Sequence, residues 1–143
     1  MTPPFTALAD LVSARVGGHA LAANDEFFAP KSNLTKPEPA VFVPGKFTPR
    51  GKWMDGWETR RRRVPGHDWC VLALGMRGVI RGINVDTSHF TGNYPSHCSL
   101  DAIDSDHEPS PAVCALEGAP WVAILPKAPL RGSSDNFLTV SDH

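Results

Sequence analysis

The sequence has little net charge and no long apolar run. Its 14 lysines and arginines nearly balance 15 aspartates and glutamates, which gives a formal net charge of −1. Without a global field of one sign, we expect the chain to bind neither nucleic acid nor an anionic membrane. No apolar stretch approaches the roughly 20 residues that a membrane-spanning helix needs. The start, residues 1–4, lacks the basic and apolar segments of a secretory signal, so we expect a cytoplasmic protein.

Cysteine is also scarce. The three cysteines, Cys70, Cys98 and Cys114, are odd in number and match no metal-binding spacing. This pattern indicates reduced thiols, and Cys70 and Cys98 lie in strand-like runs where small core residues are expected. No serine or cysteine lies in a recognisable nucleophile elbow, so the pattern does not predict a catalytic triad.

Proline and glycine, by contrast, are abundant, at 14 and 12 residues. With few long periodic apolar runs, they favour a loop-rich β domain over a helical bundle. Apolar spacing predicts a short helix or loosely docked arm over residues 1–16, which ends at Gly17 and Gly18. Residues 17–143 are then predicted to form a single β domain, because a chain of this length fits one core.

Short apolar runs separated by turn signals predict the strands of this domain. Residues 68–74 are apolar on both sides, which predicts a strand buried on both faces. Residues 31–49 are rich in proline and predict a long ordered loop. The pattern is typical of an all-β sandwich or jelly roll. The strands are predicted at residues 19–23, 68–74, 79–85, 96–103, 121–125 and 137–140.

Aromatic and charged residues gather in three segments: GKWMDGWETRR (51–61), PGHDW (65–69) and VDTSHFTGNYP (85–95). Tryptophan beside carboxylates, arginine and histidine suits a polar pocket with aromatic walls that binds a small charged molecule. The alternative is structural, with tryptophan in the core and arginine in solvent. For one segment the two interpretations are about equal; three such segments favour a binding site.

These segments resemble the signature segments of allantoicases, which hydrolyse allantoate. DEFFAP (25–30) and PGKFTPRG (44–51) extend the resemblance, which runs from about Gly17 to the C-terminus. It implies a jelly roll similar to galactose-binding domains, and the conversion of allantoate and water to ureidoglycolate and urea in purine (allantoin) degradation. Allantoicases resemble a tandem of two repeats, so the resemblance implies a first repeat that lacks its last strand. A non-catalytic binding module or assembly domain, inactive without a second repeat, is the alternative function.

Allantoate carries one carboxylate between two ureido groups, so its site needs cations, polar groups and a base that activates water. Arginine binds a carboxylate as a bidentate fork. Adjacent strand residues face opposite ways, so only one of Arg60 and Arg61 enters a pocket easily. The predicted substrate-binding residues are Lys52, Trp53, Trp57, Arg60, Arg61, Thr91, Asn93 and Tyr94.

Carboxylates and histidine are the candidates for general acid–base catalysis, with capping or backbone hydrogen bonding as the alternative for each. No cofactor is required by the pattern, but a divalent metal such as manganese is an open alternative, with a nitrogen and oxygen ligand set. A missing strand would leave unpaired backbone, so we expect a homo-oligomer or pairing with a second repeat. The catalytic candidates are Glu58, His67, Asp68 and Asp55, and the candidate metal ligands are His67, Asp86 and His89.

Overall fold

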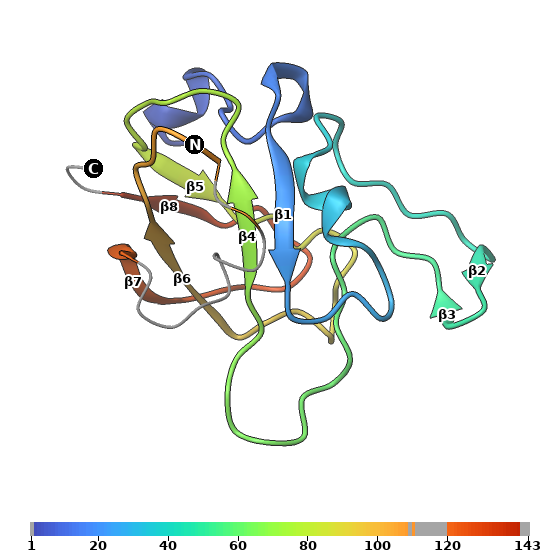
Figure 1. Ribbon diagram of the computed structural model, residues 1–143. Helices are drawn as coiled ribbons and strands as arrows, with labels where there is room; N and C mark the ends of the chain where they lie inside the picture. Colours follow the sequence, from blue (N-terminus) through green and yellow to red (C-terminus); the bar gives the residue numbers. More distant parts are fainter. Residues whose placement is uncertain (1, 109, 111–119, 141–143) are drawn as a thin grey trace. The chain divides into compact units, whose positions relative to one another are not determined.

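The computed structural model describes residues 2–108, 110 and 120–140 (Figure 1). Within these residues the regular structure is β strands and short 3₁₀ helices, which confirms the all-β class. None of the described helices has the length and apolar character of a transmembrane helix. The elements are η1 Pro4–Ala7, η2 Ala14–Val16, β1 His19–Ala23, η3 Lys31–Thr35, β2 Phe47–Thr48, β3 Gly51–Lys52, β4 Cys70–Ala73, β5 Gly82–Asn84, β6 His97–Ala102, β7 Val122–Pro129 and β8 Phe137–Thr139.

The chain divides into two compact units. The first unit comprises Met1–Asp10, Arg77–Asp106 and Gly118–His143, and the second comprises Leu11–Met76 and His107–Glu117. Each unit is built from antiparallel strand pairs, as expected for an all-β domain with short connections. The jelly-roll arrangement and the predicted boundary between residues 16 and 17 remain predictions.

The first unit contains the pairs β5 with β8 and β6 with β7. Ile83 faces Leu138 in one pair, and Leu100 faces Leu125 in the other. In β6 every second residue is half-buried, so the alternation predicted over residues 96–103 is confirmed. Inward-facing side chains of both pairs meet in a small hydrophobic core, whose buried members are Ile124, Leu125 and Val140.

The second unit contains β1 paired with β4 and the hairpin of β2 with β3. His19–Ala23 is a strand as predicted, and its register with β4 shifts between Ala20 and Ala22. The expectation that both faces of β4 are buried was wrong. Leu72 is exposed, whereas Val71 and Ala73, which face the other side of this two-stranded sheet, are half-buried.

The first residues form two 3₁₀ helices rather than a regular α-helix. The Ser13 hydroxyl accepts the backbone N–H of Arg15 and so caps the start of η2. Gly17 ends η2 with a φ of 98°, a left-handed conformation that suits glycine. The predicted stop at Gly17 is therefore confirmed.

Candidate functional site

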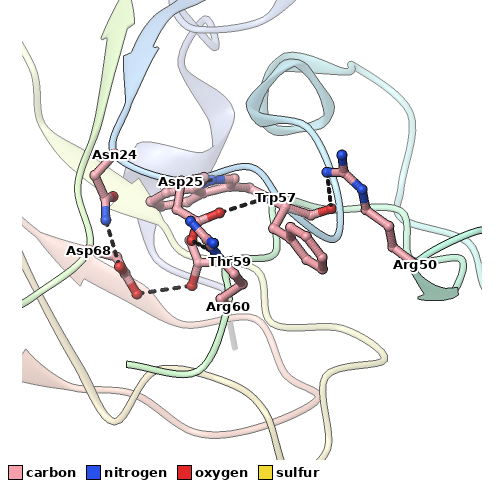
Figure 2. Close-up of polar contacts among 8 residues, drawn as sticks. Asn24, Asp25, Arg50, Trp57, Thr59, Arg60 and Asp68 are labelled. Atoms are coloured by element: carbon pink, nitrogen blue, oxygen red, sulfur yellow. Dashed lines mark hydrogen bonds and ion pairs between the residues drawn. The ribbon is translucent and has the colours of Figure 1, made fainter. Parts of the chain in front are cut away.

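The segment around Glu58 pairs with the chain that follows β1. Glu58 and Ala29 form an isolated antiparallel bridge, with Glu58 N–H donating to Ala29 O and Ala29 N–H donating to Glu58 O, each at 3.2 Å. This bridge brings the tryptophan- and arginine-bearing segment beside the turn at residues 24–28. Two segments that are separate in the sequence therefore form one surface in the second unit (Figure 2).

Asp25 lies at the centre of this surface and accepts three hydrogen bonds. Its Oδ2 accepts Nε of Arg60 at 2.8 Å, its Oδ1 accepts the N–H of Phe27 at 2.7 Å, and its backbone oxygen accepts Nε1 of Trp57 at 2.7 Å (Figure 2). The bond from Arg60 is the main cause that lowers the pKa of the Asp25 carboxyl below its usual value. The Asp25 carboxylate thus fixes Arg60, and the backbone oxygen of Asp25 fixes Trp57.

The Phe27 ring carries two guanidinium groups. Cζ of Arg50 lies 4.4 Å and Cζ of Arg60 lies 5.3 Å from the ring centroid, both within cation–π range. Arg50 also donates from Nη1 to the backbone oxygen of Phe27 at 2.9 Å. The Phe28 ring packs against the Phe27 ring in a T-shaped arrangement, with the two ring centroids 4.9 Å apart.

Asp68 has both carboxylate oxygens engaged by neutral donors. Oδ1 accepts Nδ2 of Asn24 at 2.7 Å, and Oδ2 accepts the hydroxyl of Thr59 at 2.9 Å (Figure 2). Asn24 completes the link by accepting the N–H of Trp69 at 2.8 Å. This predicted catalytic carboxylate therefore joins the end of β1, the start of β4 and the segment 57–60.

The Asp55 side chain likewise bonds to the proline-rich loop at residues 31–49. Its oxygens accept Nζ of Lys36 at 2.9 Å and the N–H of Val41 at 3.0 Å. Nearby, Lys46 lies 4.1 Å from the Trp53 ring and Lys52 lies 5.5 Å from the Phe42 ring. The predicted residue Lys52 thus lies in the β2–β3 hairpin and Trp53 directly follows it, each with an aromatic–cation contact of its own.

The remaining predicted residues of the second unit differ in exposure. Glu58 is half-buried next to its bridge with Ala29, whereas His67 and Arg61 are exposed. Of these three residues, Glu58 is the one tied to the Asp25 surface by backbone pairing, because it bridges to Ala29.

A second polar network holds the segment 85–95 in the first unit. The Thr87 hydroxyl donates to Arg131 O at 2.6 Å, and the Asn136 amide donates to Val85 O at 3.0 Å. Thr87 is only 4% and Asn136 only 5% exposed, so these are buried polar anchors. The Tyr94 ring packs so closely on Gly132 that an added Cβ would lie 2.3 Å from it.

The predicted residues fall in two groups. In the second unit Trp57 and Arg60 bond to Asp25, Glu58 pairs with Ala29, and Asp68 bonds to Asn24 and Thr59. Asp86, His89, Thr91, Asn93 and Tyr94 belong to the first unit. The proposed ligand set of His67, Asp86 and His89 spans both units. Among residues 2–108, 110 and 120–140, no group of three His, Cys, Asp or Glu is placed to hold a metal ion. Cys114 lies outside the described residues.

Sequence reasoning missed the residues that organise both groups. Asn24, Asp25 and Phe27 organise the first group, and Thr87 and Asn136 organise the second. The available signal was the segment DEFFAP (25–30), in which acids stand next to two phenylalanines. In the sequence this segment serves only to extend the resemblance.

Comparison with known proteins decides the family. The model described as "Allantoicase repeat" matches residues 9–143, which include every predicted site residue. This chain belongs to the allantoicase family. As an allantoicase-family chain, it is 49% identical over 141 residues to "Probable allantoicase 1" of Burkholderia mallei, covering 98% of this chain and 40% of that protein. It is 51% identical over 128 residues to "Probable allantoicase" of Rhizobium meliloti, covering 90% and 36%.

Solved allantoicase structures share the fold. One, titled "Structure of allantoicase", aligns with a TM-score of 0.76 and 29% identity over 92% of this chain and 38% of its own. An allantoicase from Saccharomyces cerevisiae aligns with a TM-score of 0.75 over the same shares. This allantoicase-family chain therefore spans 40% or less of the length of these relatives.

Proposed function

We propose that this chain is an allantoicase repeat that serves the hydrolysis of allantoate to ureidoglycolate and urea in the cytoplasm. The observation that carries the proposal is the family match over residues 9–143 together with relatives of about half-identical sequence that are named allantoicases. The geometry adds a surface with an exposed guanidinium, an ordered indole and a half-buried carboxylate. Such a surface suits a small molecule with one carboxylate and polar amide-like groups.

Arg60 is proposed to bind the substrate carboxylate. Its side chain is 65% exposed and donates to Asp25 through Nε, so its two terminal amino groups are on the accessible end of the side chain. Lys52, Trp53, Trp57 and Arg61 are proposed to add further contacts from the same unit. Thr91, Asn93 and Tyr94 belong to the first unit, and their contact with the ureido groups stays a prediction from the sequence.

The reaction needs a base that takes a proton from water. The water oxygen bonds to the central carbon of allantoate, the bond from this carbon to one ureido nitrogen breaks, and that nitrogen receives the proton to leave as urea. Glu58 and His67 are the proposed groups, because a half-buried carboxylate and an exposed imidazole can each take a proton from water. We assign no step to a metal.

An assembly or binding module is the second candidate function. Phe47 is 68% exposed at the β2–β3 hairpin, and the neighbouring Val41 and Val43 are also exposed. Exposed apolar side chains of this kind favour association, and the chain spans only part of the length of its relatives. We propose that this hairpin pairs with a second repeat or a second copy, and light scattering at increasing protein concentration tests it. A stable monomer at high concentration would count against this role.

Urea release from allantoate by the purified chain, with and without manganese, tests the proposed activity. We expect release that Glu58→Gln reduces at least about 100-fold, the lower end of the usual range for an acid–base group. Glu38→Gln, an exposed glutamate in the loop after η3, is the matched control and should keep full activity. Absence of urea in both conditions would contradict catalysis by this chain and favour the binding or assembly module.

A further inference from the structure

The turn at residues 25–27 contacts two arginines that are far apart in the sequence. Arg60 binds the Asp25 side chain and lies over the Phe27 ring, while Arg50 binds the Phe27 backbone and lies over the same ring. We propose that this turn is a scaffold that presents both guanidinium groups to one anionic ligand. In this arrangement Arg50 is a further ligand-binding residue, and Asp25 is a positioning residue that acts through Arg60.

The orientation of Arg60 is fixed before any ligand arrives. Nε is 2.8 Å from Asp25 Oδ2, and the guanidinium plane lies near the Phe27 ring, so the side chain is held at two points. Asp25 is itself fixed, because its second oxygen accepts the N–H of Phe27. A side chain ordered in this way loses little further conformational freedom on binding, which favours affinity.

Arg50 is held on the same platform by independent contacts. Its Nη1 bond to Phe27 O and its position 4.4 Å from the ring centroid leave the rest of the guanidinium on an exposed side chain. Both arginines thus combine an anchored edge with access to solvent. Guanidinium groups with this freedom bind carboxylates through paired N–H donors.

The charges around the turn favour an anion. The ring carries two guanidinium groups, and the carboxylate that contacts them is Asp25, which binds Arg60. The neighbouring acid Glu26 binds Lys31, with Oε2 and Nζ 3.1 Å apart. Asp68 bonds to the neutral donors Asn24 and Thr59 and keeps its negative charge. At the Phe27 ring itself, two guanidinium groups meet one bonded carboxylate, that of Asp25.

This inference rests on the proposed function only for the choice of allantoate as ligand. Isothermal titration calorimetry of the purified chain with allantoate, and separately with malonate as a simple carboxylate probe, tests it. Arg50→Ala, Arg60→Ala and Asp25→Asn should each raise the Kd about tenfold, as expected for loss of one charged hydrogen bond. Glu38→Gln removes the charge of an exposed acid in the loop after η3, outside the turn, and should change the Kd less than about twofold.

A double variant separates positioning from general destabilisation. With Arg60→Ala already present, Asp25→Asn should produce no further loss of affinity, because Asp25 acts through Arg60. An equal loss in both backgrounds would overturn the positioning role. If Asp25→Asn does not fold, Phe27→Leu removes the shared ring and should weaken binding at least as much as either arginine variant.

The two ligands keep the two proposals distinguishable. Binding of malonate but not allantoate, with sensitivity to both arginines, would support the scaffold and contradict the proposed substrate. Binding of allantoate that is insensitive to Arg50→Ala would overturn the two-guanidinium site and leave the substrate proposal standing. Binding of neither ligand would contradict both.

Discussion

Nε of Arg60 donates to Oδ2 of Asp25 at 2.8 Å, although the two residues are 35 positions apart in the sequence. This bond joins the tryptophan- and arginine-bearing segment to the turn that follows β1. The two side chains differ in exposure: that of Asp25 is 13% exposed, whereas that of Arg60 is 65% exposed. A partly buried acid therefore anchors an accessible cation.

Acid should weaken the fold partly through Asp25. The bond from Arg60 lowers the pKa of Asp25 in the folded chain, so its stabilising contribution is present above the unfolded pKa and is lost as the pH falls through the folded pKa. The contribution is about 0.5 kcal/mol, because Arg60 is solvent-screened. Urea unfolding between about pH 5 and pH 3 should show a smaller loss for Asp25→Asn than for the wild type. An identical loss in both proteins would contradict this role.

Asn136 should be the more costly asparagine to remove. Its amide donates to Val85 O and Arg131 O and accepts Arg131 N–H, all within a buried network. Asn136→Ala leaves several buried groups without partners and should lower the free energy of unfolding by about 2–3 kcal/mol. Asn33→Ala, which loses one side-chain bond to Gly56 O, is the matched control and should cost about 1 kcal/mol. Equal costs by chemical denaturation would refute the anchoring role.

His19 should make stability fall slightly as the pH rises through neutrality. The bond to Gly17 O, followed by that to Glu108, raises the pKa of His19, so the contribution is complete below the unfolded pKa and is lost above the folded pKa. Both partners are about half exposed, which limits the effect to a few tenths of a kcal/mol, or about 1 °C in Tm. Thermal melts at about pH 6 and pH 8 should differ more for the wild type than for His19→Gln. A steeper dependence in the variant would be the contrary result.

Cys70 should react slowly with alkylating reagents in the folded chain. Burial raises the pKa of its thiol to about 11, so little thiolate is present at about pH 8. Mass spectrometry of iodoacetamide-treated protein should show Cys70 modified more slowly in the folded chain than in denaturant. Cys98, whose thiol pKa is also raised by burial, gives an internal comparison. Equal rates in folded and denatured protein would rule out the protection.

Local patterns sufficed for much of the fold. The alternation of Cys98, Leu100 and Ala102 predicted β6, and the glycine at Gly17 predicted the end of η2, because both depend on residues close in sequence. The β2–β3 hairpin was missed, since two-residue strands carry too little periodicity. The exposure of Leu72 was also missed, because it depends on which strands pair and not on the strand itself.

The site was predictable in its residue types but not in its organisation. Trp57 and Arg60 were selected because their chemistry suits a small anion, and both do lie on one surface. Asp25 and Asn136 were not selected, because their partners are distant in sequence and a lone acid or amide gives no local signal of them. The bonds that engage Asp68 and Asp55 likewise come from partners distant in sequence or without a local signal, such as Thr59 and Lys36.

The most direct test of the central claim is a titration of the isotopically labelled chain with allantoate, followed by two-dimensional ¹H–¹⁵N NMR. The indole Nε1–H of Trp57 and the Nε–H of Arg60 both donate to Asp25 and therefore report on the proposed surface. We expect saturable shifts of these two signals and of the Phe27 amide. Shifts confined to other parts of the chain, or no shifts at all, would contradict an allantoate site at Asp25 and Arg60.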